Sequence, residues 1–486
     1  MDRPLTIVVE CSDAHAARAR YVLDTLFMAR GIPVEYAAQA PAEGPWLYYG
    51  ASKHAYLGSS RALILGYSAQ AWDAVATGDA PNAAETLAGL PVVFAHAEAP
   101  VFGHRALLPF DIIANAFYFL ASVAERSADS SASSRCLYAA SVFRRLDLPQ
   151  DIVDRYMQRL CDALDGLCSR IGFPVWPKRT WPQGAAYAVV LSHDVDFIPA
   201  GRGDIVRQGA KTLLRHLVRQ RRPLDAVRAG TGLIDALAHN RDPYGCIPEI
   251  IAKERSLGVR ASFQVAVGHR HPVDVNYYIE DDCTRDYLHT ILENGFDLCL
   301  HGSYRSTEDP QWYADEVALL TERLAAPQGS RQHYLSFDYD TLFAVQERTG
   351  ILYDMSMAYP DRLGTRAGFS FPYFPWNLDD DRPYDVLELS LVLMDVTLQG
   401  YMNLGARDAW ETIRETLDEL RAKRGAFSVV WHPIVFGGAR DPGYGDLFWK
   451  LAEYTQDNDG LATDGRIINE FWREGAKSYS TFRKLT

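Results

Sequence analysis

The chain has 486 residues, of which 48% are hydrophobic and 12% aromatic, a composition that excludes an intrinsically disordered protein. Its formal net charge of -13 disfavours nucleic acid as a partner and favours an acidic enzyme. The length exceeds what one ordinary hydrophobic core holds, so two domains are expected.

Targeting signals are not evident at the start of the chain. Residues 1–12 contain a short apolar run, without the longer apolar core or the small-residue cleavage site of a signal peptide. We find no unbroken apolar stretch long enough to span a bilayer. The seven cysteines are scattered without a C-x-x-C pair, which fits reduced thiols. We therefore expect a cytoplasmic protein.

The first third of the chain predicts a small α/β unit. Strands are predicted over 5–11 and 61–69, and helices over 16–31, 111–128 and 149–167. Asp111 is a plausible N-cap for the second of these helices. Residues 172–184 carry three prolines and two terminal glycines, as a linker would. We therefore expect an accessory domain over 1–178 and a second domain over 179–486.

The second domain alternates apolar runs with helical patterns. Candidate strands cover 187–193, 259–267, 296–302, 333–337, 350–356, 385–394 and 426–432. This alternation predicts an α/β fold with a mostly parallel sheet, either open or closed into a barrel.

Polar side chains recur where these strands end. Asp194 and Asp196 follow the first strand, His301 ends the third, and His432 ends the last. In a β/α barrel the carboxyl ends of the strands meet at one rim, where catalytic groups collect. We therefore expect these side chains to face the mouth of a barrel.

Asp194 and Asp196 are two positions apart, so on a strand both would point to the same face. Two close carboxylates repel each other unless a cation or a proton lies between them. One interpretation is a metal site in which one carboxylate is a ligand and its neighbour a base. The other is a turn in which both carboxylates cap loop amides.

Three histidines belong to the same pattern. His301 and His432 end apolar runs, while His333 alternates with Arg331 on a strand-like segment. A single histidine is more often structural than a ligand. Several histidines and aspartates at the ends of separate strands are harder to explain as core packing, and indicate a functional site.

In chain order, four motifs resemble those of the polysaccharide deacetylases with NodB homology (carbohydrate esterase family four). They are DVD at 194–196, HGSYR at 301–305, RQHY at 331–334 and WHP at 431–433. The resemblance implies an irregular (β/α) barrel. The first third, notably around residues 108–120, resembles the accessory domain that precedes the barrel in a subset of these proteins.

The resemblance also implies a role for each residue. One divalent ion is expected, usually zinc, with cobalt or nickel as alternatives. The implied metal ligands are Asp196 and His301, and the implied catalytic groups are Asp194 as general base, Arg331 as its partner, the Tyr334 amide as oxyanion donor and His432 as general acid.

One position departs from the family pattern. Arg305 stands where the family has a second histidine, and a guanidinium offers no lone pair to a metal. Either another residue supplies the third ligand or the site holds no metal. His333 is the best substitute, because this chain resembles a divergent branch with a histidine there.

Three further features remain open. Residues 201–230 carry eight Lys or Arg and two acids, which suits docking on an anionic membrane surface, binding of an anionic substrate, or a solvated helix. The aromatic segment 365–377 either stacks on sugar rings or packs as a plug. Asp395 either orients His432 or caps the next helix.

The resemblance implies a metal-dependent hydrolase that removes an N-acyl group, most simply acetyl, from an amino sugar or a sugar-containing biosynthetic intermediate. Its partner is then a small-molecule or oligosaccharide substrate. The alternatives are an amide hydrolase for a non-sugar substrate and an inactive descendant that binds carbohydrate.

Overall fold

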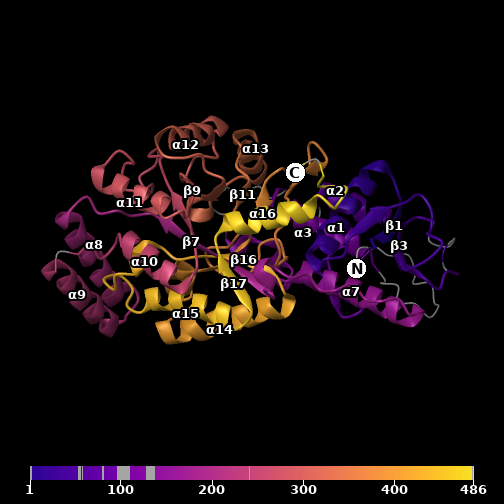
Figure 1. Ribbon diagram of the computed structural model, residues 1–486, viewed down its shortest axis with the longest axis horizontal. Coiled ribbons are helices and arrows are strands. Elements are labelled where there is room, and N and C mark those ends of the chain that lie inside the picture. The colour runs from indigo at the N-terminus through magenta and orange to yellow at the C-terminus, as the bar shows by residue number, and fades with distance from the viewer. Residues whose placement is uncertain are drawn as a thin grey trace. The chain divides into compact units, whose positions relative to one another are not determined.

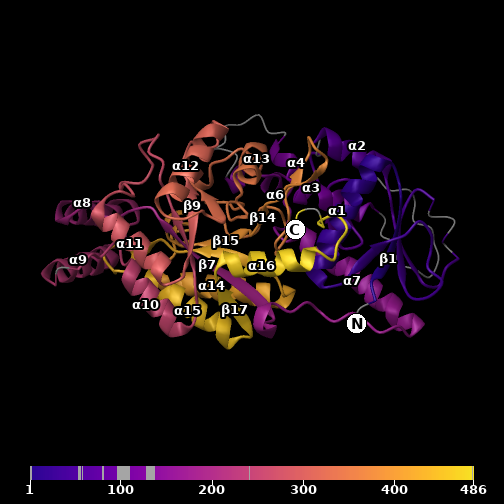
Figure 2. The ribbon, with the colours of Figure 1, turned by 45° about the horizontal axis from the view of Figure 1, so that its top comes forward.

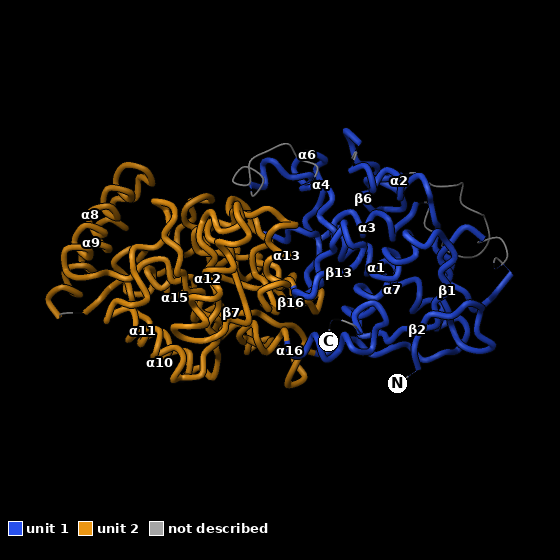
Figure 3. The backbone as a smooth tube through the Cα atoms, turned by 90° about the horizontal axis from the view of Figure 1, so that it is seen from above, with its two compact units in different colours: residues 1–180, 364–387, 470–486 blue, residues 181–363, 388–469 orange. Residues whose placement is uncertain are grey.

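The computed structural model describes residues 3–52, 56, 58–78, 81–95, 110–126, 137–239, 241–483 and 485. The chain forms two compact units, shown in different colours in Figure 3. The first contains residues 1–180, 364–387 and 470–486, and the second contains residues 181–363 and 388–469.

These units differ from the two continuous domains expected, 1–178 and 179–486, because two later segments return to the first unit. In the segment 364–387, Ser370 Oγ donates a hydrogen bond to Asp154 Oδ2 over 2.6 Å. In the segment 470–486, the Tyr479 hydroxyl donates to the carbonyl of Ile32 over 2.9 Å. The division into domains at 178/179 stays a prediction.

The first unit contains a four-stranded parallel sheet with the strand order β2-β1-β3-β4. Its elements are β1 (Leu5–Glu10), α1 (Asp13–Arg30), β2 (Val34–Tyr36), β3 (Trp46–Gly50), β4 (Ala62–Leu65), α2 (Ala69–Thr77), β5 (Glu85–Leu87), β6 (Leu90–Val92), α3 (Ile112–Leu120), α4 (Val123–Arg126), η2 (Tyr138–Ala140), α6 (Val142–Arg145), α7 (Ile152–Ile171), β12 (Trp376–Asn377) and β13 (Arg382–Pro383).

Local signals account for two of these helices. α1 ends at Gly31, whose φ of 84° lets its N–H bond back to the last turn. The Asp111 carboxylate accepts from the amides of Ile113 and Ala114, as an N-cap does. The helix predicted over 111–128 is divided at Ser122, which has a φ of 49°.

The second unit contains the parallel strands that carry the predicted site. They follow the order β14-β11-β10-β9-β8-β7-β16-β15, and β17 also pairs with β7. Their bounds are β7 (Tyr187–Val195), β8 (Ser262–Val265), β9 (Asp297–Gly302), β10 (Gly329–Gln332), β11 (Tyr353–Asp354), β14 (Leu387–Glu388), β15 (Leu391–Met394), β16 (Ala426–Val430) and β17 (Gly460–Thr463).

This strand order closes on itself. β14 and β15 stand at its two ends, yet only Leu389 and Ser390 separate them in the chain. Leu389 N–H donates to the Asp354 carbonyl on one side, and the Ser390 carbonyl accepts from Ser428 N–H on the other, both over 2.9 Å. One extended stretch therefore joins β11 to β16. This closure confirms the expected α/β class and the (β/α) barrel.

Helices lie between the strands in sequence and around them in space (Figure 1). Their bounds are η3 (Pro182–Gly184), α8 (Arg202–Leu214), η4 (Arg215–Arg219), α9 (Pro223–Ala238), α10 (Ile247–Leu257), α11 (Asp282–Glu293), α12 (Pro310–Arg323), η5 (His333–Leu335), α13 (Tyr339–Thr349), η6 (Thr397–Tyr401), α14 (Ala406–Lys423), η7 (Pro433–Val435), α15 (Tyr444–Asp457) and α16 (Gly465–Ala476), the last of which contains the boundary between the units.

The basic segment 201–230 forms most of a helical hairpin in which α8 and α9 lie side by side (Figure 2). Large apolar side chains of this hairpin are exposed: Val206, Leu214, Leu217, Val218, Leu224, Val227 and Ile234. Within the described ranges, no helix combines the length and the apolarity needed to cross a bilayer.

The strand predicted over 333–337 is wrong. The strand lies earlier, at β10, and residues 333–335 form the tight turn η5. Tyr334 and Leu335 have φ values of 57° and 52°, which a strand cannot accommodate. This turn carries His333 and Tyr334 out of the paired part of β10, toward the rim where the other polar residues gather.

Candidate active site

β7 delivers the two aspartates to the rim of the barrel. All nine of its residues are buried, because it pairs with β16 and β17 on its flanks and with β8 near its end. Asp194 lies within the strand and Asp196 follows its last residue. The apolar run holds the strand in the core, so its carboxyl end places both carboxylates at a fixed position.

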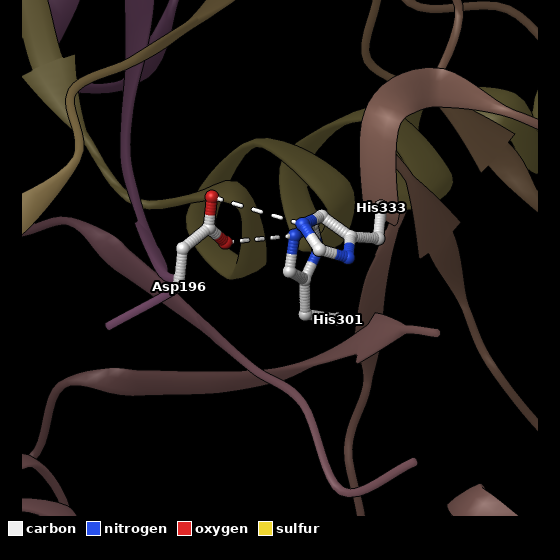
Figure 4. Close-up of side chains that lie close together, drawn as sticks. All are labelled: Asp196, His301 and His333. Carbon is white, nitrogen blue, oxygen red and sulfur yellow. Dashed lines mark ion pairs between the residues drawn. The ribbon is translucent and has the colours of Figure 1, made fainter. Parts of the chain in front are cut away.

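Asp196, His301 and His333 converge, as the sequence predicted, from the ends of β7, β9 and β10 (Figure 4). One ligand atom from each lies within 4.8 Å of the others. His301 Nε2 is 3.2 Å from Asp196 Oδ1, and His333 Nε2 is 3.8 Å from Asp196 Oδ2. Within the described part of the chain, the three form a cluster able to hold a metal ion.

Neighbouring groups orient the two imidazoles. His301 Nδ1 lies 2.9 Å from the carbonyl of Arg331, so this nitrogen carries the proton and Nε2 keeps its lone pair. His333 Nδ1 faces Asp274 Oδ1 over 3.8 Å, again on the side away from Asp196. Both rings therefore turn Nε2 toward the same carboxylate.

This arrangement fits a divalent cation. Nε2 of His301 and Oδ1 of Asp196 each present a lone pair, and Oδ1 is buried and accepts no hydrogen bond from any residue that the structure describes. Two lone pairs this close need a cation or a proton between them. Ligands about 2.1 Å from one tetrahedral ion lie about 3.4 Å apart, close to the separations observed. Imidazole nitrogen and carboxylate oxygen are donors that zinc accepts.

Charge in the cluster opposes the effect of burial. Burial raises the pKa of Asp196, but His333 and His432 outweigh it and hold that pKa well below its usual range. Burial lowers the pKa of His301, and Asp194 and Asp196 outweigh it and raise that pKa. Without a cation, the two carboxylates thus favour a proton on the His301 imidazole, so metal binding competes with that proton.

Asp194 is held by Arg331. Arg331 Nη1 donates to Asp194 Oδ1 over 2.5 Å, and Nε donates to the Met355 carbonyl over 2.9 Å. Arg331 is 1% exposed, so the guanidinium is fixed. Asp194 Oδ2 lies 4.0 Å from His301 Nε2. One carboxylate oxygen is therefore engaged by Arg331, and the other faces the metal cluster.

His432 approaches the cluster from the end of β16. Its Nε2 is 3.3 Å from Asp196 Oδ2, and its Nδ1 is 2.7 Å from Asp395 Oδ1. Burial lowers the pKa of His432, but Asp395 and Asp196 outweigh it and raise that pKa well above its usual range. Asp395 Oδ2 also accepts from the His432 amide over 3.1 Å, which agrees with the orienting role, whereas η6 has no side-chain cap from this residue.

Tyr334 and Arg305 occupy contrasting positions. The Tyr334 amide lies just past the paired part of β10, in the turn that carries His333, and its side chain is 57% exposed. Arg305 does not point into the cluster; its Nε lies 3.3 Å from the exposed Glu308 one helical turn away. Arg305, which stands at the family's histidine position in the sequence, therefore lies outside the cluster, whereas His333 lies within it.

Sequence reasoning missed Asp274. Its Oδ1 accepts from the Tyr304 amide over 2.9 Å and its Oδ2 from the His271 amide over 2.8 Å. It lies in the loop after β8, and the end of that strand was not predicted to carry a functional residue. The signal that could have found it is the high density of polar residues in this loop.

The aromatic segment 365–377 belongs to the first unit and is packed within it. Its expected role as a plug of the barrel stays a prediction. Phe374 and Trp376 are at most 1% exposed. The Arg366 side chain forms an ion pair with Glu125 over 2.8 Å, so it is not free for a substrate anion.

No protein-family model matches the chain, and no curated protein matches it either. Three solved structures are similar to it. A candidate polysaccharide deacetylase from Mycobacterium smegmatis is 18% identical, with a TM-score of 0.42, over 63% of this chain and 94% of that one.

The other two are a PuuE allantoinase and a candidate polysaccharide deacetylase from Pseudomonas aeruginosa PAO1. They are 15% and 13% identical, each with a TM-score of 0.37, and each covers 60% of this chain; the shares of the two neighbours covered are 92% and 93%. Sequence identities and TM-scores this low do not carry function from these proteins to this chain.

Proposed function

We propose that the chain is a metal-dependent hydrolase that removes an N-acyl group, most simply acetyl, from an amino sugar or a sugar-containing biosynthetic intermediate. The observation that carries this proposal is the convergence of Asp196, His301 and His333 beside the pairs Asp194–Arg331 and His432–Asp395. A ligand set, a base with a partner and an acid with a partner meet at one rim.

Asp196, His301 and His333 would hold one divalent ion and leave at least one position open, as catalytic sites do. A bound ion there polarises an amide carbonyl and lowers the pKa of a coordinated water. The Arg331 carbonyl and Asp274 keep the two imidazoles turned toward that position. Zinc is the expected metal, with cobalt or nickel as alternatives.

Asp194 is the general base in this proposal. Its Oδ2 faces the cluster and can accept a proton from the attacking water, while Oδ1 remains bonded to Arg331. Because Arg331 is buried and bonded to the Met355 carbonyl, it fixes the carboxylate in one orientation.

His432 is the general acid. Its Nδ1–H donates to Asp395, so a second proton on Nε2 faces the reacting group, and the raised pKa keeps that proton in place near neutral pH. An amine leaves an amide readily only when it is protonated, so a strongly protonated imidazole suits amide hydrolysis. We assign the Tyr334 amide the role of donor to the developing oxyanion, because it lies in the same turn as His333.

The test is acetate release by the full-length protein, stripped of metal and reloaded with zinc, cobalt or nickel. The substrates are N-acetylated amino sugars of different sizes, together with a non-sugar amide such as acetyl-lysine. Release from the sugars supports the proposal, and release from acetyl-lysine alone supports a non-sugar hydrolase. No release with any metal, together with sugar binding, would indicate an inactive carbohydrate-binding protein. A cytoplasmic location stays a prediction.

A further inference from the structure

A pocket of about 410 Å³ opens beside the His432 imidazole. Arg215 and Arg219 line it from η4, Tyr401 lines it from η6, and Arg440 lines it from the segment after η7. This volume lies within the range of small-molecule sites. Because His432 and Asp395 are also part of its wall, the pocket is continuous with the acid end of the candidate active site.

The pocket carries more positive than negative charge, although the whole chain has a net charge of -13. Asp395 is engaged by His432, which leaves Asp441 as the carboxylate facing the three arginines of the lining. Asp441 Oδ1 accepts from Arg215 over 2.6 Å, and its Oδ2 lies 3.4 Å from Arg440 Nε. One carboxylate is thus shared by two guanidinium groups, and Arg219 adds a third.

Two buried polar atoms of the residues lining this pocket lack a hydrogen-bond partner among the described residues. Arg215 Nε and Gln220 Oε1 are buried and form no hydrogen bond with any described residue. Burial lowers the pKa of Arg215; Asp441 counteracts this, while Arg440 and Arg219 lower the pKa further. The arginines are therefore close enough to repel one another. A buried donor left unpaired is costly, and a ligand with acceptor oxygens would satisfy it.

The backbone that lines this pocket is also irregular. η4 and η6 are both π-helical turns, and both line this pocket. Turns of this kind are rare and occur frequently at functional sites. Charge, one unpaired buried donor and backbone irregularity thus coincide within one cavity.

We propose that this pocket binds a phosphate or diphosphate group on the amine-bearing part of the substrate, so that the substrate is a phosphorylated N-acyl amino sugar. The inference rests on the proposed function, in which His432 protonates the leaving amine. A pocket that opens beside His432 holds the amine side of the scissile bond rather than the acyl side. Arginine side chains bind phosphate oxygens with paired N–H donors and suit such a group.

A kinetic comparison tests the substrate class. The zinc-loaded full-length protein is assayed with N-acetylglucosamine 1-phosphate and with neutral methyl N-acetylglucosaminide. We expect the Arg219→Gln/Arg440→Gln variant to lose about 10- to 100-fold in kcat/KM for the phosphorylated sugar and less than about 3-fold for the neutral one. Equal losses on both sugars, or no preference for the phosphorylated sugar in the unaltered protein, would overturn the proposal.

Two further variants guard against misfolding and nonspecific charge effects. Arg219→Gln alone changes an exposed side chain, and we expect it to show the same selective loss at smaller size. Arg207→Gln removes an exposed arginine of α8 that pairs with Asp204, and we expect no change with either sugar. If Arg207→Gln acts as strongly as Arg219→Gln, the effect comes from overall charge and the proposal fails.

Binding of pyrophosphate separates this inference from the proposed function. Calorimetry on the full-length protein requires no turnover. We expect binding to persist in Asp194→Asn, which lacks the base, and to weaken about 10-fold or more in Arg219→Gln/Arg440→Gln. Pyrophosphate binding without any amide hydrolysis would support the pocket and reject the hydrolase. Hydrolysis of the neutral sugar without pyrophosphate binding would support the hydrolase and reject the phosphate-binding pocket.

Two sources of the phosphate are separated by substrate choice. UDP-N-acetylglucosamine carries a soluble nucleotide diphosphate, and a polyprenyl-diphosphate-linked N-acetylglucosamine in detergent carries a lipid-linked one. Turnover of either substrate that depends on Arg219 and Arg440 supports the proposal and identifies the source. Turnover of both that is unaffected by the double variant would overturn it.

Discussion

The Nδ1 atom of His432 lies 2.7 Å from Oδ1 of Asp395, while its Nε2 lies 3.3 Å from Oδ2 of Asp196. One imidazole thus bridges a carboxylate of the metal cluster and a carboxylate outside it. The pair Asp395–His432 sets the protonation of the proposed acid, and this leads to a first prediction.

Replacing Asp395 with Asn should shift the pH dependence of kcat/KM. Activity requires protonated His432, so it falls as pH rises through the pKa of that group. Asp395 raises this pKa, so its loss lowers the pKa and moves the alkaline limb to lower pH. The measurement is a pH profile of both proteins with the same metal. An alkaline limb that stays in place in Asp395→Asn would remove His432 from the role of acid.

The ligand set is tested by metal content. We expect about one zinc per chain in the purified protein and loss of that metal in His301→Ala and in His333→Ala, measured by mass spectrometry. Arg305→Ala is the matched control, because Arg305 pairs with Glu308 outside the cluster and should leave the metal bound. Metal retained in His333→Ala would reject the third ligand proposed here.

The base can be separated from the ligands. Asp194→Asn should lower kcat by about 10²- to 10⁴-fold while metal content stays unchanged, because Asp194 faces the cluster without belonging to the ligand set. Asp282→Asn, at an exposed carboxylate on α11, serves as the control and should match the unaltered protein. Loss of metal in Asp194→Asn would instead make this residue a ligand.

Glu316 should make the stability of the fold depend on pH. Burial raises its pKa from 4.5 to about 7. Between those values the folded state holds a proton that the unfolded state has released, so stability falls as pH rises through this window. The loss amounts to about 3 kcal/mol between pH 5 and 8.

Chemical denaturation of the unaltered protein and of Glu316→Gln at several pH values measures this effect. Gln cannot titrate, so the variant should lack the decline. Glu322 lies on the same helix and its side chain is 69% exposed, so the Glu322→Gln variant should still show the decline in stability as pH rises. Parallel stability curves for the unaltered protein and Glu316→Gln would contradict the prediction.

The hairpin of α8 and α9 should bind vesicles that contain anionic lipid. Its exposed Leu217, Val218 and Leu224 lie within the basic segment, a combination suited to the surface of an anionic bilayer. Replacing these three by Ser should weaken co-sedimentation about tenfold or more, and Val175→Ser, at another exposed apolar position, should not. Equal binding to neutral vesicles at high salt would argue against an anionic surface.

The sequence predicted the architecture of the rim better than the path of the chain that builds it. The apolar run of β7 and the polar residues at the ends of β7, β9 and β16 were visible, because alternating strands and helices force those ends together. The turn at His333 could not be predicted, because nothing in the neighbouring sequence indicates the two consecutive positive φ values at Tyr334 and Leu335. The motif singled out His333 although the strand around it was misplaced, and the role of His333 as a ligand stays a prediction.

The return of two later segments of the chain to the first unit could not be predicted from the sequence, for a different reason. Segments 364–387 and 470–486 belong to the first unit through contacts with residues hundreds of positions away, and composition carries no record of such pairs. Asp274 was missed because its role comes from accepting the amides of Tyr304 and His271 beside His333, which only the folded loop provides.

The extended stretch around Leu389 and Ser390 that closes the ring runs directly into Asp395. The three proposed ligands all precede residue 334, whereas Asp395 and His432 follow this stretch. In the proposed mechanism, the three ligands therefore come from segments that precede the ring closure, and the acid and its partner come from segments that follow it. The closing stretch would thus set the position of the proposed acid relative to the ion.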